Sequence, residues 1–488
     1  MEKKSIAVIA SRLKCVDAVS VEAERWIDKY SKLGYKVHLI SGKFGEPVEL
    51  PHFELPEMDY KHPEVRGVKN IVFSAKLNKD GKKAAEILLN NLVKRIKGPL
   101  KNYLVQNKIQ VLSIEDALMS LKNLPLSIAM AQIVSELNLP TISRYHYLPW
   151  ANPYFTKHEN FSKMLADLPP RDRNIVHITN TESARKQLNE AKKIQSRVIP
   201  NTIDIEKLHT KDEYNSDFRK AFGIRDDQII FLQPTRVKRN KFVERSIKLV
   251  AEINDITKKD NVLLITGSPV YSRGNYFEEV IKRKDKQKVQ VIFANDRIFL
   301  SRHQNPEQKF YSIHDAYVHA DIVLYPNIGD AFGNPIIEAA AYKKPVVVDS
   351  FPNLNEFVEK GFKFVKMDQK VDAEVVSDTY EIIANEAKAG EIIEANFALL
   401  KKHYSSDVLD DSIIPILNSF DEQPGFMARM ANIIPPFWKR TQEPQKKESF
   451  KAKQPQAKQD GSRPAQHAKK EGPDLRNKKG SYKEPQKK

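Results

Sequence analysis

The sequence predicts an α/β protein made of two doubly wound parallel sheets. Short β-branched runs alternate with amphipathic segments of helical length, which is typical of βαβ units. The candidate strands are continuous apolar runs, and such runs indicate strands that are covered on both faces. A chain of 488 residues with 41% hydrophobic residues is also long enough to bury the cores of two ordinary domains.

The candidate strands fall into two groups along the chain. The first group is "SIAVIA" (5–10), "KVHLIS" (36–41), "IQVLSI" (109–114) and "NIVHIT" (174–179). The second group is "QIIFLQP" (228–234), "NVLLIT" (261–266), "VQVIFA" (289–294), "DIVLYP" (321–326) and "KPVVVD" (344–349). Segments with apolar residues at i, i+3 and i+4 follow the leading strand of each group, so we expect helices at 21–35 and 243–253.

A seam between the two sheets is predicted near residue 200, where "SRVIPNTIDIEKL" (196–208) runs from a strand into a Pro-Asn turn. We therefore expect a first domain at 1–198 and a second at 199–390. Helices at 391–420 would follow the last strand and cross back onto the first domain. Ligands of open α/β sheets bind beyond the carboxyl ends of the strands, so the expected site is a cleft where the two domains face each other.

Residues 421–488 are predicted to be a disordered tail. Within it, residues 439–488 contain 16 Lys and Arg against 6 Asp and Glu, so this segment carries +10 of the net charge of +17. Almost no aliphatic residues are present there to offset the entropy of ordering. Contact of this basic tail with a polyanion or with an anionic membrane surface is the alternative to a tail that is only solvated.

Three features of the composition favour a cytoplasmic protein. No run of eighteen apolar residues occurs, and the N-terminal "SIAVIAS" lacks a small-residue cleavage site. The single cysteine, Cys15, cannot form an internal disulfide or a zinc cage, in agreement with a reducing compartment. Peripheral attachment at the inner membrane face stays open through the tail.

The segment "GDAFGNPIIEAAAYKKPVVVDS" (329–350) places two carboxylates, Asp330 and Glu338, around a Phe-Gly-Asn-Pro turn. A strand ends just before this segment, and Pro335 is typical of a first helical turn. The backbone N–H groups of the turn then lie at a helix N-terminus, where they favour an anion or sugar hydroxyls. Ordinary capping of that helix is the alternative interpretation of the two carboxylates.

A second signal is the pair of cations in "QPTRVKRNKFVERSI" (233–247). Arg236 follows the end of a strand, and Lys241 is expected to open the next helix. Two cations at such a place suit a pyrophosphate, because each charged hydrogen bond contributes about 1.5–3 kcal/mol. Their charge would also stabilise a departing nucleoside diphosphate, which is a catalytic effect. Solvated surface cations are the alternative.

Three motifs in this order resemble the retaining glycosyltransferases of family 4, which have the GT-B fold of two Rossmann-like domains. They are the strand-Arg-x4-Lys segment, "VIPNTIDIEKL" (198–208) and the acid-x-Phe-Gly-x-Pro-x-x-Glu segment. The resemblance covers roughly residues 1–415. More narrowly, "LQPTR" (232–236), "DAYVHADIVLYPNIGDAFGNPIIEAA" (315–340), "DALMSLKNLPLSIAMA" (116–131) and "SRYHYLPW" (143–150) resemble the branch that makes mannosylglucosylglycerate and related small glycosides.

The resemblance implies roles for individual residues. In the second domain, Arg236 and Lys241 would bind the donor diphosphate and Glu338 the nucleotide ribose. Asp330 would bind the donor hexose together with the turn formed by Phe332, Gly333 and Asn334. In the first domain, His146 would lie beside the transferred sugar, and the N-terminal loop with Asp17, Ala18 and Ser20 would approach donor and acceptor. The residues expected to act in catalysis are Asp330, His146, Arg236 and Lys241.

Several positions depart from the family pattern. The first acid is Asp330 rather than the commoner Glu, and Tyr147 stands where the narrower branch has Asp. Ala18, Thr202 and Phe242 stand where the family has Gly. Replacing Gly costs on the order of 1–2 kcal/mol where the backbone needs a positive φ, so these loops are expected to be reshaped.

Simpler interpretations exist for some of these residues. His146 lies between aromatic residues, and this pattern also suits a histidine that is buried in the core with its hydrogen bonds satisfied there. Asp17 and Ser20 are good helix caps. His314 and Asp315 precede a strand, and we expect them to be surface residues rather than metal ligands.

The sequence therefore predicts a retaining hexosyltransferase that moves mannose or glucose from a GDP-mannose or UDP-glucose type donor to a small glycoside or other hydroxyl acceptor. No cofactor or metal is expected, because no two aspartates are separated by a single residue and the two cations can neutralise the diphosphate. The alternatives are an envelope-polysaccharide glycosyltransferase at the membrane surface, a sugar-nucleotide epimerase, a non-catalytic nucleotide-sugar-binding protein and a basic nucleic-acid or lipid binder.

Overall fold

The computed structural model describes residues 4–15, 17–73, 78–158, 160–270 and 275–421. All of them belong to one compact unit of the chain. The predicted disordered tail lies outside the described residues, apart from its first residue.

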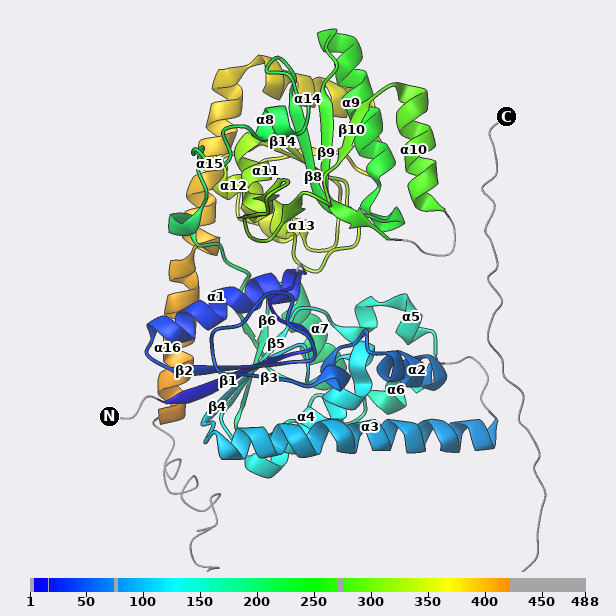
Figure 1. Cartoon of the computed structure of the whole chain (residues 1–488), viewed down its shortest axis with the longest axis vertical. Coiled ribbons are helices and arrows are strands. Elements are labelled where there is room, and N and C mark those ends of the chain that lie inside the picture. Colours follow the sequence, from blue (N-terminus) through cyan, green and yellow to red (C-terminus); the bar gives the residue numbers. More distant parts are fainter. Residues whose placement is uncertain (1–3, 16, 74–77, 159, 271–274, 422–488) are drawn as a thin grey trace, which may run out of the picture. The chain divides into compact units, whose positions relative to one another are not determined.

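The N-terminal sheet has seven parallel strands in the order β3-β2-β1-β4-β5-β6-β7 (Figure 1). The strand order reverses between β1 and β4, which makes this the topological switch point of the sheet. All four strands predicted for this half are present. The bounds are β1 (Ser5–Ala10), β2 (Lys36–Ser41), β3 (His52–Glu54), β4 (Val111–Glu115), β5 (Thr141–Tyr145), β6 (Ile175–Thr179) and β7 (Arg197–Val198).

Helices cover both faces of this sheet, because successive side chains of each strand point to opposite faces. In β1, Ala7 and Ile9 pack in one hydrophobic cluster with α2, α3 and α4, while Ile6 and Val8 pack in a second cluster with α1. The helices are α1 (Ala18–Lys32), α2 (Pro63–Val72), α3 (Lys79–Gln106), α4 (Leu124–Leu137), α5 (Pro153–Thr156), α6 (Asn160–Met164) and α7 (Glu182–Lys192), with short 3-10 turns at Pro56–Met58, Leu121–Asn123 and Pro149–Ala151.

The C-terminal sheet has six parallel strands in the order β10-β9-β8-β14-β15-β16, and all five strands predicted for this half are present. The residues between β10 and β14 of the chain form a small three-stranded sheet of order β11-β13-β12. The bounds are β8 (Ile230–Val237), β9 (Val262–Pro269), β10 (Gln290–Phe293), β11 (Ile298–Phe299), β12 (His303–Gln304), β13 (Lys309–Ser312), β14 (Ile322–Tyr325), β15 (Val346–Val348) and β16 (Val365–Lys366).

This second sheet is doubly wound like the first. Ile230 and Leu232 of β8 belong to one hydrophobic cluster, and Phe231 between them belongs to another. The helices are α8 (Phe218–Ala221), α9 (Val243–Thr257), α10 (Tyr276–Gln287), α11 (Ile313–His319), α12 (Asn334–Ala341), α13 (Leu354–Glu359) and α14 (Ala373–Ala384), with 3-10 turns at Ile205–Lys207 and Arg239–Lys241.

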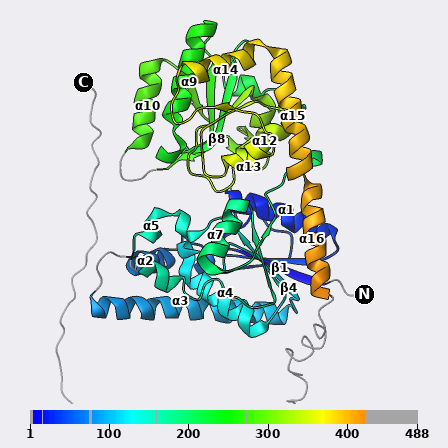
Figure 2. The ribbon, with the colours of Figure 1, turned by 180° about the vertical axis from the view of Figure 1, so that it is seen from behind.

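Two final helices divide their contacts between the two cores (Figure 2). α15 (Glu386–Tyr404) contributes Leu400 and Tyr404 to a cluster of the C-terminal sheet. α16 (Ser406–Asp421) contributes Leu409, Ile413 and Ile416 to the cluster that covers β1 and α1. The chain thus passes from one core to the other at Ser405.

Candidate active site

Asp330 lies on the loop between β14 and α12, beyond the carboxyl end of β14. Its carboxylate accepts hydrogen bonds from Asn327 Nδ2 at 2.9 Å and from the backbone N–H of Phe332 at 3.2 Å. The Phe332 amide, predicted to bind the donor hexose, is therefore held by Asp330 in this structure. The Phe332 side chain is buried in the hydrophobic core, so only its backbone can face a ligand.

Gly333 and Asn334 form the start of α12. Gly333 has a φ of 106°, and a Cβ placed on it would lie 2.8 Å from Cζ of Phe351, so this position requires glycine. Asn334 is the first residue of the helix, and its Oδ1 accepts a hydrogen bond of 2.8 Å from Asn201 Nδ2. The predicted turn at a helix N-terminus is thus present, and Asn201 of the "VIPNTIDIEKL" segment supports it.

The two predicted cations lie at the same edge of the C-terminal sheet. Lys241 ends a 3-10 turn before α9 instead of opening the helix, and its Nζ lies 3.4 Å from Asp330 Oδ2. Burial lowers the pKa of Lys241, and the neighbouring Asp330 opposes this shift. Arg236 is exposed near the end of β8, and no described residue forms a hydrogen bond or ion pair with its side chain. One cation is paired with a carboxylate, and the other is free for an anion.

Glu338 lies in the second turn of α12 and accepts a hydrogen bond of 2.6 Å from the hydroxyl of Tyr317 on α11. Burial raises the pKa of Glu338, and the hydrogen bond from Tyr317 opposes this rise. Tyr317 itself is buried and stacks on Tyr342. The hydroxyl of Tyr317 therefore helps to keep the Glu338 carboxylate ionised and ready to accept hydrogen bonds.

The resemblance assigns the nucleotide ribose to Glu338, so replacing Tyr317 by phenylalanine should raise the Kd for a nucleoside diphosphate by about tenfold at neutral pH, because Glu338 then loses a charged hydrogen bond of about 1.5–3 kcal/mol that orients its carboxylate. Without that bond the pKa of Glu338 rises further, so the loss of binding on acidification should begin at a higher pH than in the unmodified protein. Calorimetric titration with UDP and GDP between pH 5 and 8 measures both effects.

Tyr311→Phe is the matched control, since Tyr311 is also buried but donates its hydrogen bond to Asp217, away from α12. Equal Kd values and equal pH profiles for Tyr317→Phe and the unmodified protein would contradict this role.

His146 follows β5 and is buried in the N-terminal half. Its Nε2 lies 2.7 Å from Glu115 Oε2 at the end of β4. Arg144 donates a hydrogen bond of 3.2 Å to the other oxygen of Glu115 and one of 3.1 Å to Glu22 on α1. Burial alone would raise the pKa of Glu115, but Arg144 and His146 outweigh it and hold this pKa below its ordinary value. His146 is thus a buried histidine that is fixed by a network of charges.

Asp116 completes this arrangement. It has a φ of 56°, which is unusual for a residue other than glycine, and its Oδ1 accepts the backbone N–H groups of His146 and Tyr147 at 2.7 and 3.3 Å. Glu115 and Asp116 therefore clamp the end of β5 from the neighbouring strand. Neither residue was predicted from the sequence. A signal was present, because Glu115 and Asp116 directly follow the strand run "VLSI", and ligands of such sheets bind beyond the carboxyl ends of the strands.

The N-terminal loop residues have capping contacts. Asp17 is the N-cap of α1, and its carboxylate accepts the Ser20 N–H at 3.1 Å. The Ser20 hydroxyl donates to the carbonyl of Arg12 at 3.2 Å. Ala18 is the first residue of α1 and is exposed. The structure gives Asp17 and Ser20 a role in starting α1.

Tyr147 connects the predicted residues of the two halves. Partial burial of its hydroxyl raises its pKa, and the nearby charges of Asp330, Asp116 and Asp17 raise it further, while Arg236 opposes them. The ring remains 43% exposed. Asp330 and Arg236 of the C-terminal half thus lie within electrostatic reach of the residue that follows His146.

One of the three replaced glycines occupies a left-handed backbone. Phe242 has a φ of 43°, whereas Ala18 and Thr202 are not among the described residues with positive φ. The Phe242 ring lies under the Arg245 guanidinium, whose carbon is 3.8 Å from the ring centre, and Arg245 pairs with Asp349. A cation–π contact thus offsets part of the strain at this position.

This backbone predicts an inverted order of stability for two substitutions at Phe242. Both Phe242→Ala and Phe242→Gly lose the ring, but only Ala keeps the strained φ, so the Gly variant should be more stable than the Ala variant by about 1 kcal/mol. At an ordinary φ glycine would be the less stable of the two by about 0.5–1 kcal/mol. Urea denaturation of both variants measures the difference, and a more stable Ala variant would contradict the left-handed conformation.

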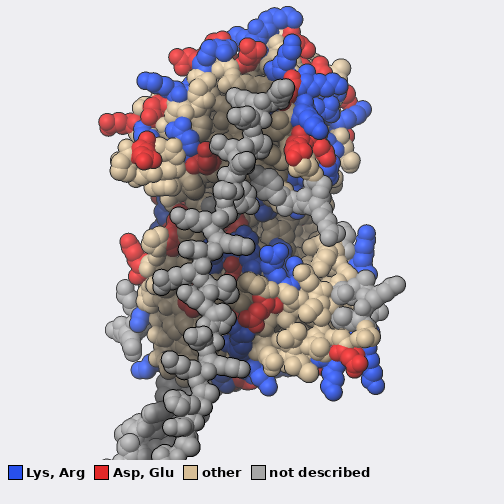
Figure 3. Space-filling view, turned by 45° about the vertical axis from the view of Figure 1, so that its right-hand side comes forward, with Lys and Arg blue, Asp and Glu red and all other residues tan. Residues whose placement is uncertain are grey.

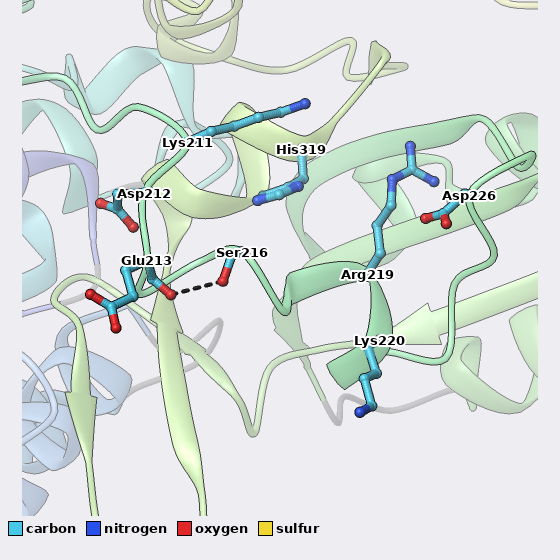
Figure 4. A pocket seen from close by; sticks show the side chains of 8 residues that line it. All are labelled: Lys211, Asp212, Glu213, Ser216, Arg219, Lys220, Asp226 and His319. Atoms are coloured by element: carbon cyan, nitrogen blue, oxygen red, sulfur yellow. Dashed lines mark hydrogen bonds between the residues drawn. The ribbon is translucent and has the colours of Figure 1, made fainter.

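A hollow on the surface of the C-terminal half is separate from these residues (Figure 4). It has a volume of about 590 Å³ and is lined by charged side chains that include Asp212, Arg219 and His319. Arg219 pairs with Asp321, and Asp212 pairs with Arg302. None of the predicted site residues lines this hollow, and two of its charged groups already have partners.

The expectation that His314 and Asp315 are surface residues is wrong. Asp315 is fully buried, caps α11 together with Ser312 and pairs with Arg302. His314 is partly buried and contacts the Tyr342 hydroxyl at 2.7 Å. Within the part of the chain that the structure describes, no group of three or more His, Cys, Asp and Glu side chains could hold a metal ion. No helix of the described residues is long and apolar enough to cross a membrane.

Comparison with known proteins places this geometry in context. Residues 215–399 match the family model described as Glycosyl transferases group 1. The chain is 25% identical over 435 residues to the mannosylglucosylglycerate synthase of Thermotoga maritima, with 83% of this chain and 98% of the relative covered. It is 26% identical over 402 residues to the synthase of the same name from Petrotoga mobilis, with 78% and 90% covered.

Solved structures share the fold at low sequence identity. Sucrose-phosphate synthase from Thermosynechococcus elongatus has a TM-score of 0.61 at 14% identity, and 86% of this chain and 99% of that chain are covered. HepE of Anabaena, solved in complex with UDP and glucose, has a TM-score of 0.60 at 14% identity, with 85% and 100% covered. The chain thus shares the GT-B fold of these structures, and the match of residues 215–399 to the group 1 glycosyl transferases, with the two long relatives, makes it a glycosyltransferase.

Proposed function

We propose that this glycosyltransferase is a retaining, metal-independent hexosyltransferase. It moves mannose or glucose from a nucleoside diphosphate sugar of the GDP-mannose or UDP-glucose type to a small glycoside or other hydroxyl acceptor in the cytoplasm. Attack occurs on the face from which the diphosphate departs, and a diphosphate oxygen helps to accept the acceptor proton. Closure of the two domains assembles the site and excludes water.

The observation that carries the proposal is the group formed by Lys241, Asp330 and Arg236 beside the N-terminus of α12. The pairing of Lys241 with Asp330 at 3.4 Å holds the ammonium at the carboxyl edge of the sheet, and Arg236 has no partner there among the described residues. A diphosphate suits two cations and a helix N-terminus, and Asp330 is then placed to accept hydroxyls of the attached sugar.

Similar proteins support the identity of the donor. The Anabaena protein was solved with UDP, with UDP and glucose, and with UDP-glucose. The two relatives from Thermotoga and Petrotoga are named for a product that contains mannose. Glu338, held by Tyr317, suits the ribose that both donor types contain.

On the face drawn in Figure 3, the charges of the described residues favour a small-molecule acceptor over a polyanionic one. Figure 3 shows Lys and Arg side chains mixed with Asp and Glu side chains on the face that it draws, without a broad patch of one sign. A protein body that grips a long polyanion needs such a patch. The basic segment that would attach the chain to a membrane or to another polyanion lies outside the described residues.

Thermal shift with a panel of nucleoside diphosphate sugars tests donor binding, because a ligand that binds only the folded state raises the Tm. GDP-mannose or UDP-glucose should give the largest shift, and no shift with any nucleotide sugar would contradict the proposed donor site.

Donor consumption measured with and without EDTA then tests the metal requirement. Lys241, Arg236 and the N-terminus of α12 supply the positive charge that a divalent ion would otherwise supply, so equal rates are expected. A strict requirement for a divalent ion would contradict the mechanism, and retention is checked by the anomeric configuration of the product.

A further inference from the structure

The hollow drawn in Figure 4 lies at the edge of the C-terminal sheet that is opposite to the candidate active site. Its lining comes from the segment 211–220, from Asp226 just before β8 and from His319 at the end of α11, just before β14. Arg236 and Asp330 lie at the other ends of these same two strands. A strand rises about 3.3 Å per residue, so the eight residues of β8 keep the two places roughly 20 Å apart. A ligand in the hollow would therefore be separate from the proposed donor.

Two cations of the hollow, Lys211 and Arg219, are only partly neutralised. Lys211 is exposed, and no described residue forms a hydrogen bond or ion pair with its side chain. Arg219 Nη1 donates to the backbone carbonyls of Arg225 and Gln228 at 2.9 and 3.0 Å. Arg219 Nη2 lies 3.3 Å from the exposed carboxylate of Asp321. The guanidinium is thus held in place, and the ammonium is free for an anion.

Two further basic groups lie within electrostatic reach of these cations. Burial lowers the pKa of His319, and the charges of Lys211 and Arg219 lower it further. Burial lowers the pKa of Lys344 as well; Asp321 opposes this shift, and the same two cations add to it. The positive charges gathered here therefore repel one another, and a bound anion would relieve this repulsion.

The acids of the lining leave room for that anion. Asp212 is already paired with Arg302 at 2.7 Å, and Figure 4 shows the carboxylate of Glu213 turned away from the cations. No described residue forms a hydrogen bond or ion pair with the side chain of Asp226. The Ser216 hydroxyl donates to the backbone carbonyl of Glu213 at 2.9 Å, so its oxygen can still accept. The hollow thus offers cations to an anionic group and oxygen acceptors to hydroxyls.

We propose that this hollow is a second binding site, for the phosphate group of a small hydrophilic compound. Lys211, Arg219 and His319 bind the phosphate, and Asp226 and Ser216 accept hydrogen bonds from hydroxyls of the rest of the ligand. A phosphate suits three donors better than a carboxylate does, because it presents three acceptor oxygens and nearly two negative charges. The volume of about 590 Å³ lies within the usual range for small-molecule sites. This site goes beyond the proposed hexosyl transfer and does not depend on it.

Calorimetric titration of the full-length chain with glucose 6-phosphate, inorganic phosphate and glucose tests the site. The two phosphates should bind, and glucose, which lacks the anionic group, should not. Lys211→Met should raise the Kd for both phosphates at least about tenfold, which corresponds to the loss of one charged hydrogen bond. Tighter binding of glucose 6-phosphate would assign the site to a phosphorylated polyol, and equal affinities would assign it to free phosphate.

Lys282→Met is the matched control, because Lys282 is also an exposed lysine of the C-terminal half but lies on α10, outside the hollow. It should leave the Kd for both phosphates unchanged. Arg236→Met shows whether the phosphates enter the proposed donor site instead, and it should also leave their Kd unchanged. Absence of phosphate binding to the unmodified protein, an unchanged Kd in Lys211→Met, or weakened phosphate binding in Arg236→Met would each overturn the inference.

Discussion

Replacing Lys241 by alanine should lower the rate of hexosyl transfer at least about tenfold, because losing roughly 1.4 kcal/mol of transition-state stabilisation is enough for that effect. The Lys241 ammonium is partly buried beside Asp330, so its charge is screened less by water than that of a surface lysine. In the proposed mechanism, the substitution removes this charge from the place where the diphosphate leaves. It also leaves the Asp330 carboxylate without its cation. The unpaired carboxylate then repels an anionic donor.

Initial rates at saturating acceptor, with kcat and KM for the donor determined separately, measure this effect. Lys282→Ala serves as the control, because Lys282 is an exposed lysine on α10 of the same half. Circular dichroism establishes that both variants are folded. Turnover at the unmodified rate in a folded Lys241→Ala protein would refute the assigned role.

Glu115→Gln should reduce the free energy of unfolding by about 3 kcal/mol at neutral pH, since removing one partner of a buried ion-pair network is strongly destabilising and leaves Arg144 with Glu22 as its remaining carboxylate partner. Glu115 is buried, and it neutralises Arg144 and orients His146 at the same time. The glutamine keeps the size of the side chain, so the loss reports the charge and not a cavity. Transfer should also slow, because the ring of His146 is no longer fixed.

The effect of this substitution should depend on pH with a definite sign. The pKa of Glu115 is lower in the folded protein than its ordinary value of about 4.3, so its stabilising contribution is complete above that pH. The contribution is lost as the pH falls through the folded-state pKa. Urea denaturation at pH 7 and below pH 4 measures the free energy of unfolding of Glu115→Gln and of the unmodified protein. The difference between the two should be large at pH 7 and smaller below pH 4.

Glu64→Gln is the control for this experiment. Glu64 also pairs with an arginine, Arg95, but both side chains are about half exposed, and exposed pairs contribute only about 0–1 kcal/mol. Equal losses of stability for the two variants would show that burial of the Glu115 network has no energetic consequence.

The long apolar runs made the fold predictable. All nine predicted strands are present, and the helix predicted at 243–253 matches α9 (Val243–Thr257). The strands β3, β7 and β16 were not predicted from the sequence. Each has only two or three residues, which is too few for a periodic pattern to form. The helix predicted at 21–35 begins three residues earlier in α1, because Asp17 caps it.

The site was predictable where a local pattern carries the chemistry. Asp330, Gly333 and Glu338 lie on one strand–turn–helix segment, so their spacing places them together. Lys241 is distant from Asp330 in sequence, yet both follow neighbouring strands of the sheet, β8 and β14, and meet at its edge. The roles proposed for these residues remain predictions.

The supporting contacts were not predictable, because they join residues that only the tertiary structure brings together. Tyr317 reaches Glu338 from another helix, and Glu22 reaches Arg144 across 122 positions of sequence. A buried acid also looks the same in sequence as an exposed one, which is why Asp315 was expected at the surface. Burial of charge is a property of the packed core, and no local pattern of residues encodes it.

The position of α16 has a consequence for the way the chain is synthesised. Its side chains cover Ile6 and Val8 of β1, and α16 leaves the ribosome about 400 residues later than this strand. At ordinary elongation rates this interval is on the order of half a minute, during which this face of β1 has α1 but lacks α16, the second helix that covers it. This apolar face of β1 therefore needs protection from aggregation until α16 has been synthesised.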